Sequence, residues 1–161
     1  MIHHVSFAAI NPFHVATVMA EVMQGTVAPF PPNPGSYIVI AGDEHGTMLE
    51  IYPLNSQILP GLSNEEAVFA ETPNPSRFTA THIALSINNN EETICQIAAR
   101  EGWRVLHAER DGFFEVIEFW VENRLMVELL PPSIAPRYLA FMQPQNLAKL
   151  FAEMEPEMAM V

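Results

Sequence analysis

The feature that most constrains the fold is an internal duplication. When the sequence is shifted by 78 positions, residues 4–7 fall on residues 82–85, and residues 48–53 fall on residues 126–131. Both shared segments lie at the ends of their halves, so the match spans the whole unit. Self-similarity at a fixed offset indicates two copies of one supersecondary unit. We therefore expect two structurally equivalent halves that pack together.

Each half shows the same predicted order of elements. Residues 2–10 and 80–88 alternate their side chains and are rich in branched and aromatic residues, which predicts strands. An apolar stripe at helical spacing follows each strand, and Gly25 and Gly102 end the two predicted helices. Three more extended segments follow in each half, at 26–30, 36–42 and 47–53 and at 103–109, 113–121 and 125–130. The sequence thus predicts the unit βαβββ twice.

These elements predict an α+β fold. Two βαβββ modules are related by a pseudo-twofold axis and form a curved-sheet cleft. We expect one domain over residues 1–161, with the first module at 1–53, a connection at 54–78, the second module at 79–131 and a tail at 132–161. Apolar residues at helical spacing in that tail predict a C-terminal helix over about 145–155.

Composition narrows the classes of partner. A chain of 161 residues with 49% apolar content is long enough for one packed domain and is too apolar for a disordered chain. Seven basic against nineteen acidic residues give a net charge of −12, which disfavours nucleic acid, acidic membranes and anionic ligands. The single cysteine, Cys95, fits a reducing compartment, so we expect a cytoplasmic protein. No segment predicts a signal peptide or a membrane span.

Four residues at symmetric positions form a candidate metal site. Side chains alternate faces along a strand, so His4 and His82 share a face of their first strands, and Glu50 and Glu128 share a face of their last strands. A pseudo-twofold axis would bring all four together. Two imidazoles and two carboxylates suit a divalent ion such as Ni, Co, Fe, Mn or Zn. If the strand register shifts by one residue, His3 takes the place of His4.

The same alternation predicts the lining of the pocket. Residues two positions from the four candidate ligands share their faces and give a largely apolar lining with one hydroxyl-bearing aromatic residue. The predicted lining residues are Ser6, Met48, Tyr52, Ser86, Met126 and Leu130. His107 lies in a strand without a matching partner, and we leave open whether it faces the cleft.

The segments Thr-His-Ile-Ala-Leu-Ser-Ile at 81–87 and Met-Val-Glu-Leu at 126–129 resemble the vicinal oxygen chelate superfamily, and within it bacterial glyoxalase I. The resemblance covers residues 1–53 and 79–131. It implies paired modules around a cleft, a homodimer, and one metal ligand from the first and last strand of each module, namely His4, Glu50, His82 and Glu128. It also implies that Glu128 is the catalytic base, with Glu50 as its symmetric rival.

The sequence departs from that enzyme where glutathione is bound. The resemblance places an arginine at position 8 and an asparagine at position 54, and this chain has Ala8 and Leu54. We therefore expect a glyoxalase-like metal-dependent lyase or isomerase that acts on a small carbonyl compound, through a metal-stabilised enediolate and without glutathione. One alternative is a metal-free small-molecule-binding or resistance-like protein. A further alternative is an extradiol-type dioxygenase, which the lack of a tyrosine between His82 and Glu128 disfavours.

Overall fold

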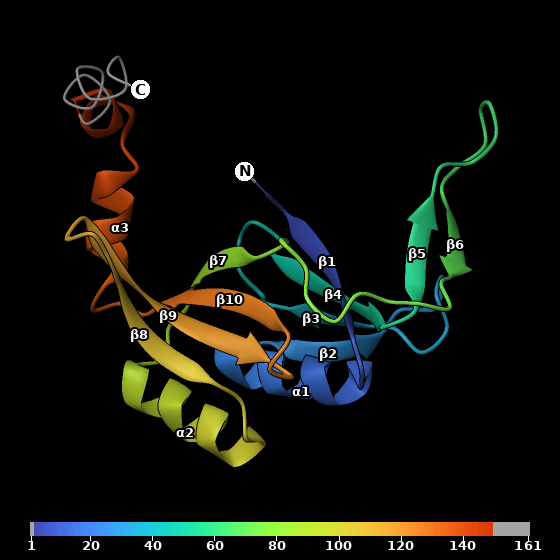
Figure 1. Ribbon diagram of the computed structural model, residues 1–161, viewed down its shortest axis with the longest axis horizontal. Coiled ribbons are helices and arrows are strands. Elements are labelled where there is room, and N and C mark those ends of the chain that lie inside the picture. The colour runs from blue at the N-terminus through green and yellow to red at the C-terminus, as the bar shows by residue number, and fades with distance from the viewer. Residues whose placement is uncertain (1, 150–161) are drawn as a thin grey trace.

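The computed structural model describes residues 2–149 and confirms the α+β fold class (Figure 1). In chain order the elements are β1 (His4–Ala9), α1 (Pro12–Met23), β2 (Thr26–Pro29), β3 (Tyr37–Ile40), β4 (Met48–Pro53), β5 (Ser56–Leu59), β6 (Val68–Glu71), β7 (Ile83–Ser86), α2 (Glu91–Glu101), β8 (Val105–Arg110), β9 (Phe114–Val121), β10 (Leu125–Leu130) and α3 (Ala135–Phe141). With β5, β6 and α3 set aside, the order is βαβββ twice, as the duplication predicts.

The two modules repeat each other in strand order and in register. One sheet has the order β1-β4-β3-β2 and the other has the order β7-β10-β9-β8. In each sheet the first and last strands of the module run parallel, and Ser6 lies beside Glu50 as Ala84 lies beside Glu128. Ala84 and Glu128 lie 78 positions after Ser6 and Glu50, respectively. The offset read from the sequence is therefore also the offset of the strand pairing.

Asparagine side chains begin both helices. The Asn11 side chain accepts a hydrogen bond from the His14 amide (3.2 Å), and the Asn90 side chain accepts one from the Thr93 amide (2.9 Å). Gly102 ends α2 in the left-handed region, as predicted. In α1, Gln24 takes that conformation (φ 56°) in place of the predicted Gly25. Gly25 is needed for another reason, because a Cβ there would collide with the Ile40 carbonyl oxygen.

Each helix covers one face of its own sheet, and the two helices lie on the same side of the molecule (Figure 1). Alternation along β4 separates two faces: Leu49 and Ile51 are fully buried in the core beside Val18 and Val22 of α1, whereas Glu50 faces away from it. Ile94 and Ile97 of α2 are part of the same core, as are the odd-numbered residues of β10. The helix side of each sheet thus forms the core, and the opposite face of β4 carries Glu50.

Contacts between α1 and α2 join the two modules. Arg100 donates to both carboxylate oxygens of Glu21 (3.1 and 2.7 Å), and His14 lies 2.6 Å from Glu101. The amide of Asn89 donates to the backbone carbonyl of Glu21 at the end of α1 (2.9 Å). The modules therefore meet through their helices, and the described residues form two separate four-stranded sheets within the chain.

Two features depart from the sequence prediction. The connection at 54–78 contains the hairpin β5–β6, which projects from one end of the molecule, where the sequence predicts no strand (Figure 1). In the tail, the helix α3 precedes the predicted one. Residues 144–149 are helical, and the rest of the predicted helix at 145–155 lies outside the described residues. Within residues 2–149, no helix is long and apolar enough to cross a membrane.

Candidate functional site

Glu50 is a buried carboxylate held by two hydroxyl groups. The residue is only 7% exposed, on the face of β4 opposite the core. Ser6 of β1 donates to its Oε2 atom (2.6 Å), and the Tyr52 hydroxyl donates to the same oxygen. A buried charge is tolerated only when hydrogen bonds replace its water. The parallel register that places Ser6 beside Glu50 supplies the first of these bonds, and the alternation of β4 supplies the second.

Tyr52 is itself fixed by aromatic packing. Its ring lies 5.8 Å from that of Phe30 and 5.4 Å from that of Phe69, which belongs to the inserted strand β6. Burial, and then the hydrogen bond to Glu50, raises the pKa of the Tyr52 hydroxyl to about 12. The hydroxyl therefore keeps its proton throughout the neutral pH range and donates a hydrogen bond to Glu50. The hairpin thus helps to shape this site from outside the repeated unit.

His4 completes the first half of the predicted metal site. Its Nε2 atom lies 3.9 Å from Oε2 of Glu50, and its side chain is 54% exposed. An exposed imidazole next to a buried carboxylate gives one nitrogen and one oxygen donor, the types that bind borderline divalent ions. His4 and Glu50 thus form a two-residue half-site. Neighbouring His3 lines the same cavity as His4, and its Nδ1 atom lies 2.7 Å from the backbone oxygen of His45.

The second module is different at the equivalent glutamate. Arg110 of β8 donates to Glu128 (2.7 Å) and to Glu118 (3.0 Å), which lies directly opposite Glu128 in the antiparallel pair β9–β10. These two bonds raise the pKa of Arg110. Trp120 donates to the other oxygen of Glu118 (3.2 Å). Glu128 is therefore paired with a fixed cation, whereas Glu50 is paired with neutral hydroxyls.

The two histidines share a cavity, but the four predicted ligands are not gathered in one place. His4, Met48 and His82 line a cavity of about 380 Å³ between the modules. His82 is exposed, and its Nδ1 atom lies 3.2 Å from the backbone oxygen of Ala80. Within residues 2–149, no group of three or more His, Cys, Asp or Glu side chains is placed to hold a metal ion. Within one chain, the predicted ligands therefore do not form a single metal site.

The predicted pocket residues are spread over several surroundings. Ser6 lines a separate cavity of about 430 Å³, and Ser86 lines one of about 360 Å³. Tyr52 and Leu130 are buried, at 6% and 3% exposure, and Met126 is half-buried. Leu130 belongs to the hydrophobic core, and a common pocket for these residues stays a prediction.

Sequence reasoning missed Arg110 and Glu118. A glutamate opposite Glu128 could have been inferred only from the pairing of β9 with β10, which depends on the geometry of a three-residue turn. His107, left open from the sequence, contacts Glu91 at the start of α2 (2.9 Å) and so faces the helix. The signal that could have revealed Arg110 is its rarity, because the chain has only seven basic residues.

Comparison with known proteins identifies the fold. No protein-family model matches the sequence, and no curated protein matches it. Among solved structures, the fosfomycin resistance protein FosX from Listeria monocytogenes is 12% identical, with a TM-score of 0.54, over 81% of this chain and 92% of that one. FosX complexed with Mn(II) and sulfate is 13% identical, with a TM-score of 0.52, over 81% of this chain and 88% of that one. A lactoylglutathione lyase from Agrobacterium tumefaciens is 9% identical, with a TM-score of 0.52, over 82% and 93%.

These proteins share little sequence with the chain, and what they share is the arrangement of paired modules. The likeness spans most of both chains, so it covers both βαβββ units and is not limited to one of them. The chain therefore has the fold of the vicinal oxygen chelate superfamily, as its resemblance to that superfamily predicts.

Proposed function

We propose that the protein is a glyoxalase-like, metal-dependent lyase or isomerase that acts on a small carbonyl compound without glutathione. The observation that carries the proposal is the half-site of His4 and Glu50, in which a buried carboxylate lies 3.9 Å from an exposed imidazole. FosX, which has the same fold, has been crystallised with Mn(II). The donor types fit Ni, Co, Fe, Mn or Zn. When bound, such an ion polarises a carbonyl group.

The proposal includes a homodimer, because one chain does not gather the four ligands. In the described sheets, β1 and β7 are both edge strands, so each module has one open edge beside its histidine. We propose that His4 and Glu50 of one chain meet His82 and Glu128 of a second copy. A twofold axis would then create two equivalent sites per dimer.

In this scheme the two glutamates have different roles. Ser6 and Tyr52 hold Glu50 in place, which suits a residue that orients an ion. Glu128 is the proposed proton-transfer group, and the hydrogen bond from Arg110 holds its carboxylate in place. Positioned proton transfer contributes about 10²–10⁴-fold, so we expect Glu128→Gln to lose about that much activity while keeping the fold. The rival assignment gives this role to Glu50.

The first experiment is elemental analysis of protein purified without chelators, followed by a screen against small 2-oxoaldehydes. We expect bound divalent metal in the wild type and a large loss of it in His4→Ala and Glu50→Gln. His107→Ala is the matched control, because His107 contacts α2 and lies outside the half-site. Equal metal content in all four proteins would refute the assignment. The activities of Glu50→Gln and Glu128→Gln on the identified substrate are then compared to find which glutamate is the catalytic base. An equal or larger loss of activity in Glu50→Gln would overturn the role of Glu128.

Complementation tests the shared site. A chain carrying His4→Ala with Glu50→Gln is mixed, after unfolding and refolding, with a chain carrying His82→Ala with Glu128→Gln. If the sites lie between chains, half of the dimers are mixed and each has one intact site, so activity returns to about a quarter of the wild-type value. Sites within one chain would give no recovery.

The second candidate is a metal-free small-molecule-binding or resistance-like protein. One observation favours it: Arg110 already supplies a cation to Glu128, at 2.7 Å, so this carboxylate has a charged partner without a metal ion. Absence of metal from protein that still binds small molecules would support this candidate over the enzyme. A cytoplasmic location stays a prediction under both.

A further inference from the structure

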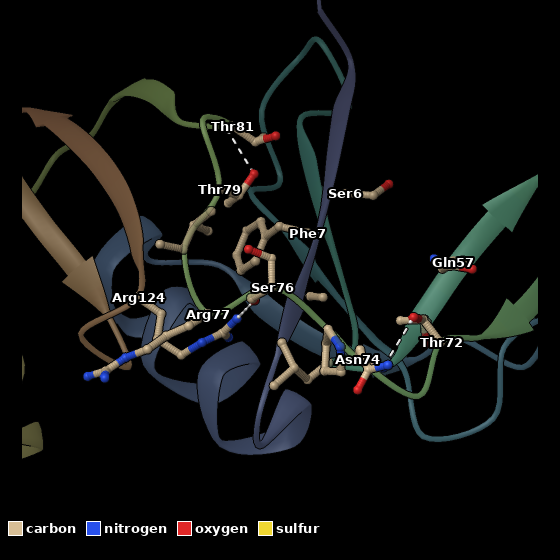
Figure 2. Close-up of a pocket in the computed structure, with 15 residues that line it drawn as sticks. Ser6, Phe7, Gln57, Thr72, Asn74, Ser76, Arg77, Thr79, Thr81 and Arg124 are labelled. Atoms are coloured by element: carbon tan, nitrogen blue, oxygen red, sulfur yellow. Dashed lines mark hydrogen bonds between the residues drawn. The ribbon is translucent and has the colours of Figure 1, made fainter.

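A cavity of about 430 Å³ that includes residues of the edge strand β1 has an unusual charge for this acidic chain (Figure 2). Its walls come from β1, from the start of the hairpin β5–β6, from the segment 72–81 and from the turn before β10. Its side chains are mostly hydroxyls, amides and arginines. The lining residues that matter for binding are Ser6, Gln57, Arg77, Thr79, Thr81 and Arg124.

The charge of this cavity is opposite to that of the chain. The protein has nineteen acidic and seven basic residues, yet no acidic residue lines the cavity, and Arg77 and Arg124 do. Figure 2 shows the two arginines on one side of the cavity and Gln57 on the other. The net charge of −12 disfavours anionic ligands at long range, but that field is screened within about 10 Å at ordinary salt, whereas direct contacts are not. The local charge therefore decides what the cavity accepts.

Arg124 is held in place by the turn between β9 and β10. Two residues of this turn, Glu122 and Asn123, have positive φ (51° and 54°), and the turn brings Arg124 to the cavity wall. Its Nη2 atom donates to the Ser76 carbonyl (2.9 Å), and its side chain is only 12% exposed. Such a guanidinium has lost most of its water and has donors left over.

Glu122, the acidic partner of Arg124, is too far away to make a hydrogen-bonded ion pair with it. The Oε2 atom of Glu122 lies 3.9 Å from Nη1 of Arg124. The two carboxylate oxygens of Glu122 instead accept hydrogen bonds from the backbone amides of Ile10 (2.6 Å) and Asn11 (2.8 Å). Arg77, the second arginine, is exposed, and its guanidinium lies over the ring of Phe78 at 5.1 Å. Stacking on a ring restricts the side chain and leaves the in-plane N–H groups free for a ligand.

We propose that this cavity binds the oxyanion group of a small molecule, that is, a carboxylate, phosphonate or phosphate. Planar guanidinium groups match the paired oxygens of these anions, and charge-assisted hydrogen bonds of this kind are the strong ones. Hydroxyls of Thr79 and Thr81 lie on the same wall and add neutral donors (Figure 2).

One residue, Ser6, links this cavity to the half-site of His4 and Glu50. Ser6 lines it, and the Ser6 hydroxyl donates to Glu50 at 2.6 Å. An anion held by the arginines would direct the rest of its molecule along β1 towards Glu50. In this respect the inference rests on the proposed function and names its substrate class, an anionic carbonyl compound. Binding of the anion itself requires no metal.

The test measures binding of simple anions to the full chain after treatment with a chelator. Inorganic phosphate, methylphosphonate and acetate are titrated at constant ionic strength by calorimetry, with acetamide as the neutral counterpart of acetate. We expect saturable binding of at least one anion and none of acetamide. Arg77→Gln and Arg124→Gln each weaken that binding by about tenfold or more. Lys149→Gln is the control, because it makes the same change of charge outside the cavity.

Three outcomes would overturn the inference: no saturable anion binding, equal binding of acetamide, or an equal loss in Lys149→Gln. Arg77 is exposed, so Arg77→Gln stays informative even if Arg124→Gln fails to fold. Metal content is measured on untreated samples of the same preparations. Protein that binds metal but no anion refutes this inference alone, and protein that binds an anion but no metal refutes the proposed metal enzyme alone.

Discussion

Replacement of Tyr52 by phenylalanine tests how Glu50 is held. The tyrosine is 6% exposed and the glutamate 7%, so water cannot easily replace the lost hydroxyl. A hydrogen bond to a charged group is worth about 1.5–3 kcal/mol, and a buried acceptor left short of donors costs a similar amount. Ser6 still donates to the same oxygen, which limits the loss. We expect Tyr52→Phe to lower the free energy of unfolding by about 2 kcal/mol at neutral pH.

The same residue gives a pH dependence with a definite sign. The pKa of Tyr52 is about 12, above its ordinary value of 10.0, because burial and then the bond to Glu50 disfavour the charged form. Below pH 10 both the folded and the unfolded chain hold this proton. Between pH 10 and about 12 only the folded chain holds it, so the stability from this group falls by about 1.4 kcal/mol for each pH unit.

Urea unfolding of metal-free wild type and Tyr52→Phe, compared at several pH values, isolates this group from other titrating residues. We expect the wild type to be more stable at neutral pH and its advantage to shrink above pH 10. Tyrosinate absorbance gives a second measurement, because the substitution should remove a component of the titration that lies near pH 12. The reasoning is refuted if the advantage stays constant up to about pH 12, or if the substitution removes a tyrosine that titrates near 10.

Three further predictions follow from other contacts. Arg110→Gln leaves Glu118 and Glu128 facing each other without a cation, so we expect the free energy of unfolding in urea to fall by about 1–3 kcal/mol. Adding Glu118→Gln should restore part of this loss. Additive effects of the two substitutions would argue against the cluster. Phe69→Ala removes half of the aromatic packing on Tyr52 and should cost about 1–2 kcal/mol, while an unchanged midpoint would show that the hairpin does not support the site. With Ala8 and Leu54 at the glutathione positions, the methylglyoxal–glutathione hemithioacetal should bind roughly ten- to a hundredfold more weakly than in an enzyme that has both contacts, and efficient turnover of it would contradict this.

The duplication predicted the βαβββ elements, and the register of the strand pairs follows because each pair must keep its apolar face on the core. Shifting β4 or β10 by one residue would turn Leu49 or Val127 out of that core. The hairpin β5–β6 was not predictable in this way, since its strands have four residues each and sit within a polar, proline-rich segment. Arg110 was missed because its contacts depend on three strands at once, and no local pattern records such a meeting.

The departure from symmetry says more about the site than the symmetry does. Across the 78-residue offset, the hydroxyl donors Ser6 and Tyr52 become Ala84 and Leu130, so Glu128 loses both of the groups that hold Glu50. Arg110 takes over, paired with a second carboxylate that the first module lacks, because Ile38 lies opposite Glu50. Both halves of the duplication have kept the glutamate, but its partners differ. Glu50 accepts hydrogen bonds from neutral hydroxyls, whereas Glu128 is ion-paired with Arg110. In the proposed enzyme, such different surroundings favour two different tasks for the two carboxylates, one of holding an ion and one of proton transfer, over a symmetric cage.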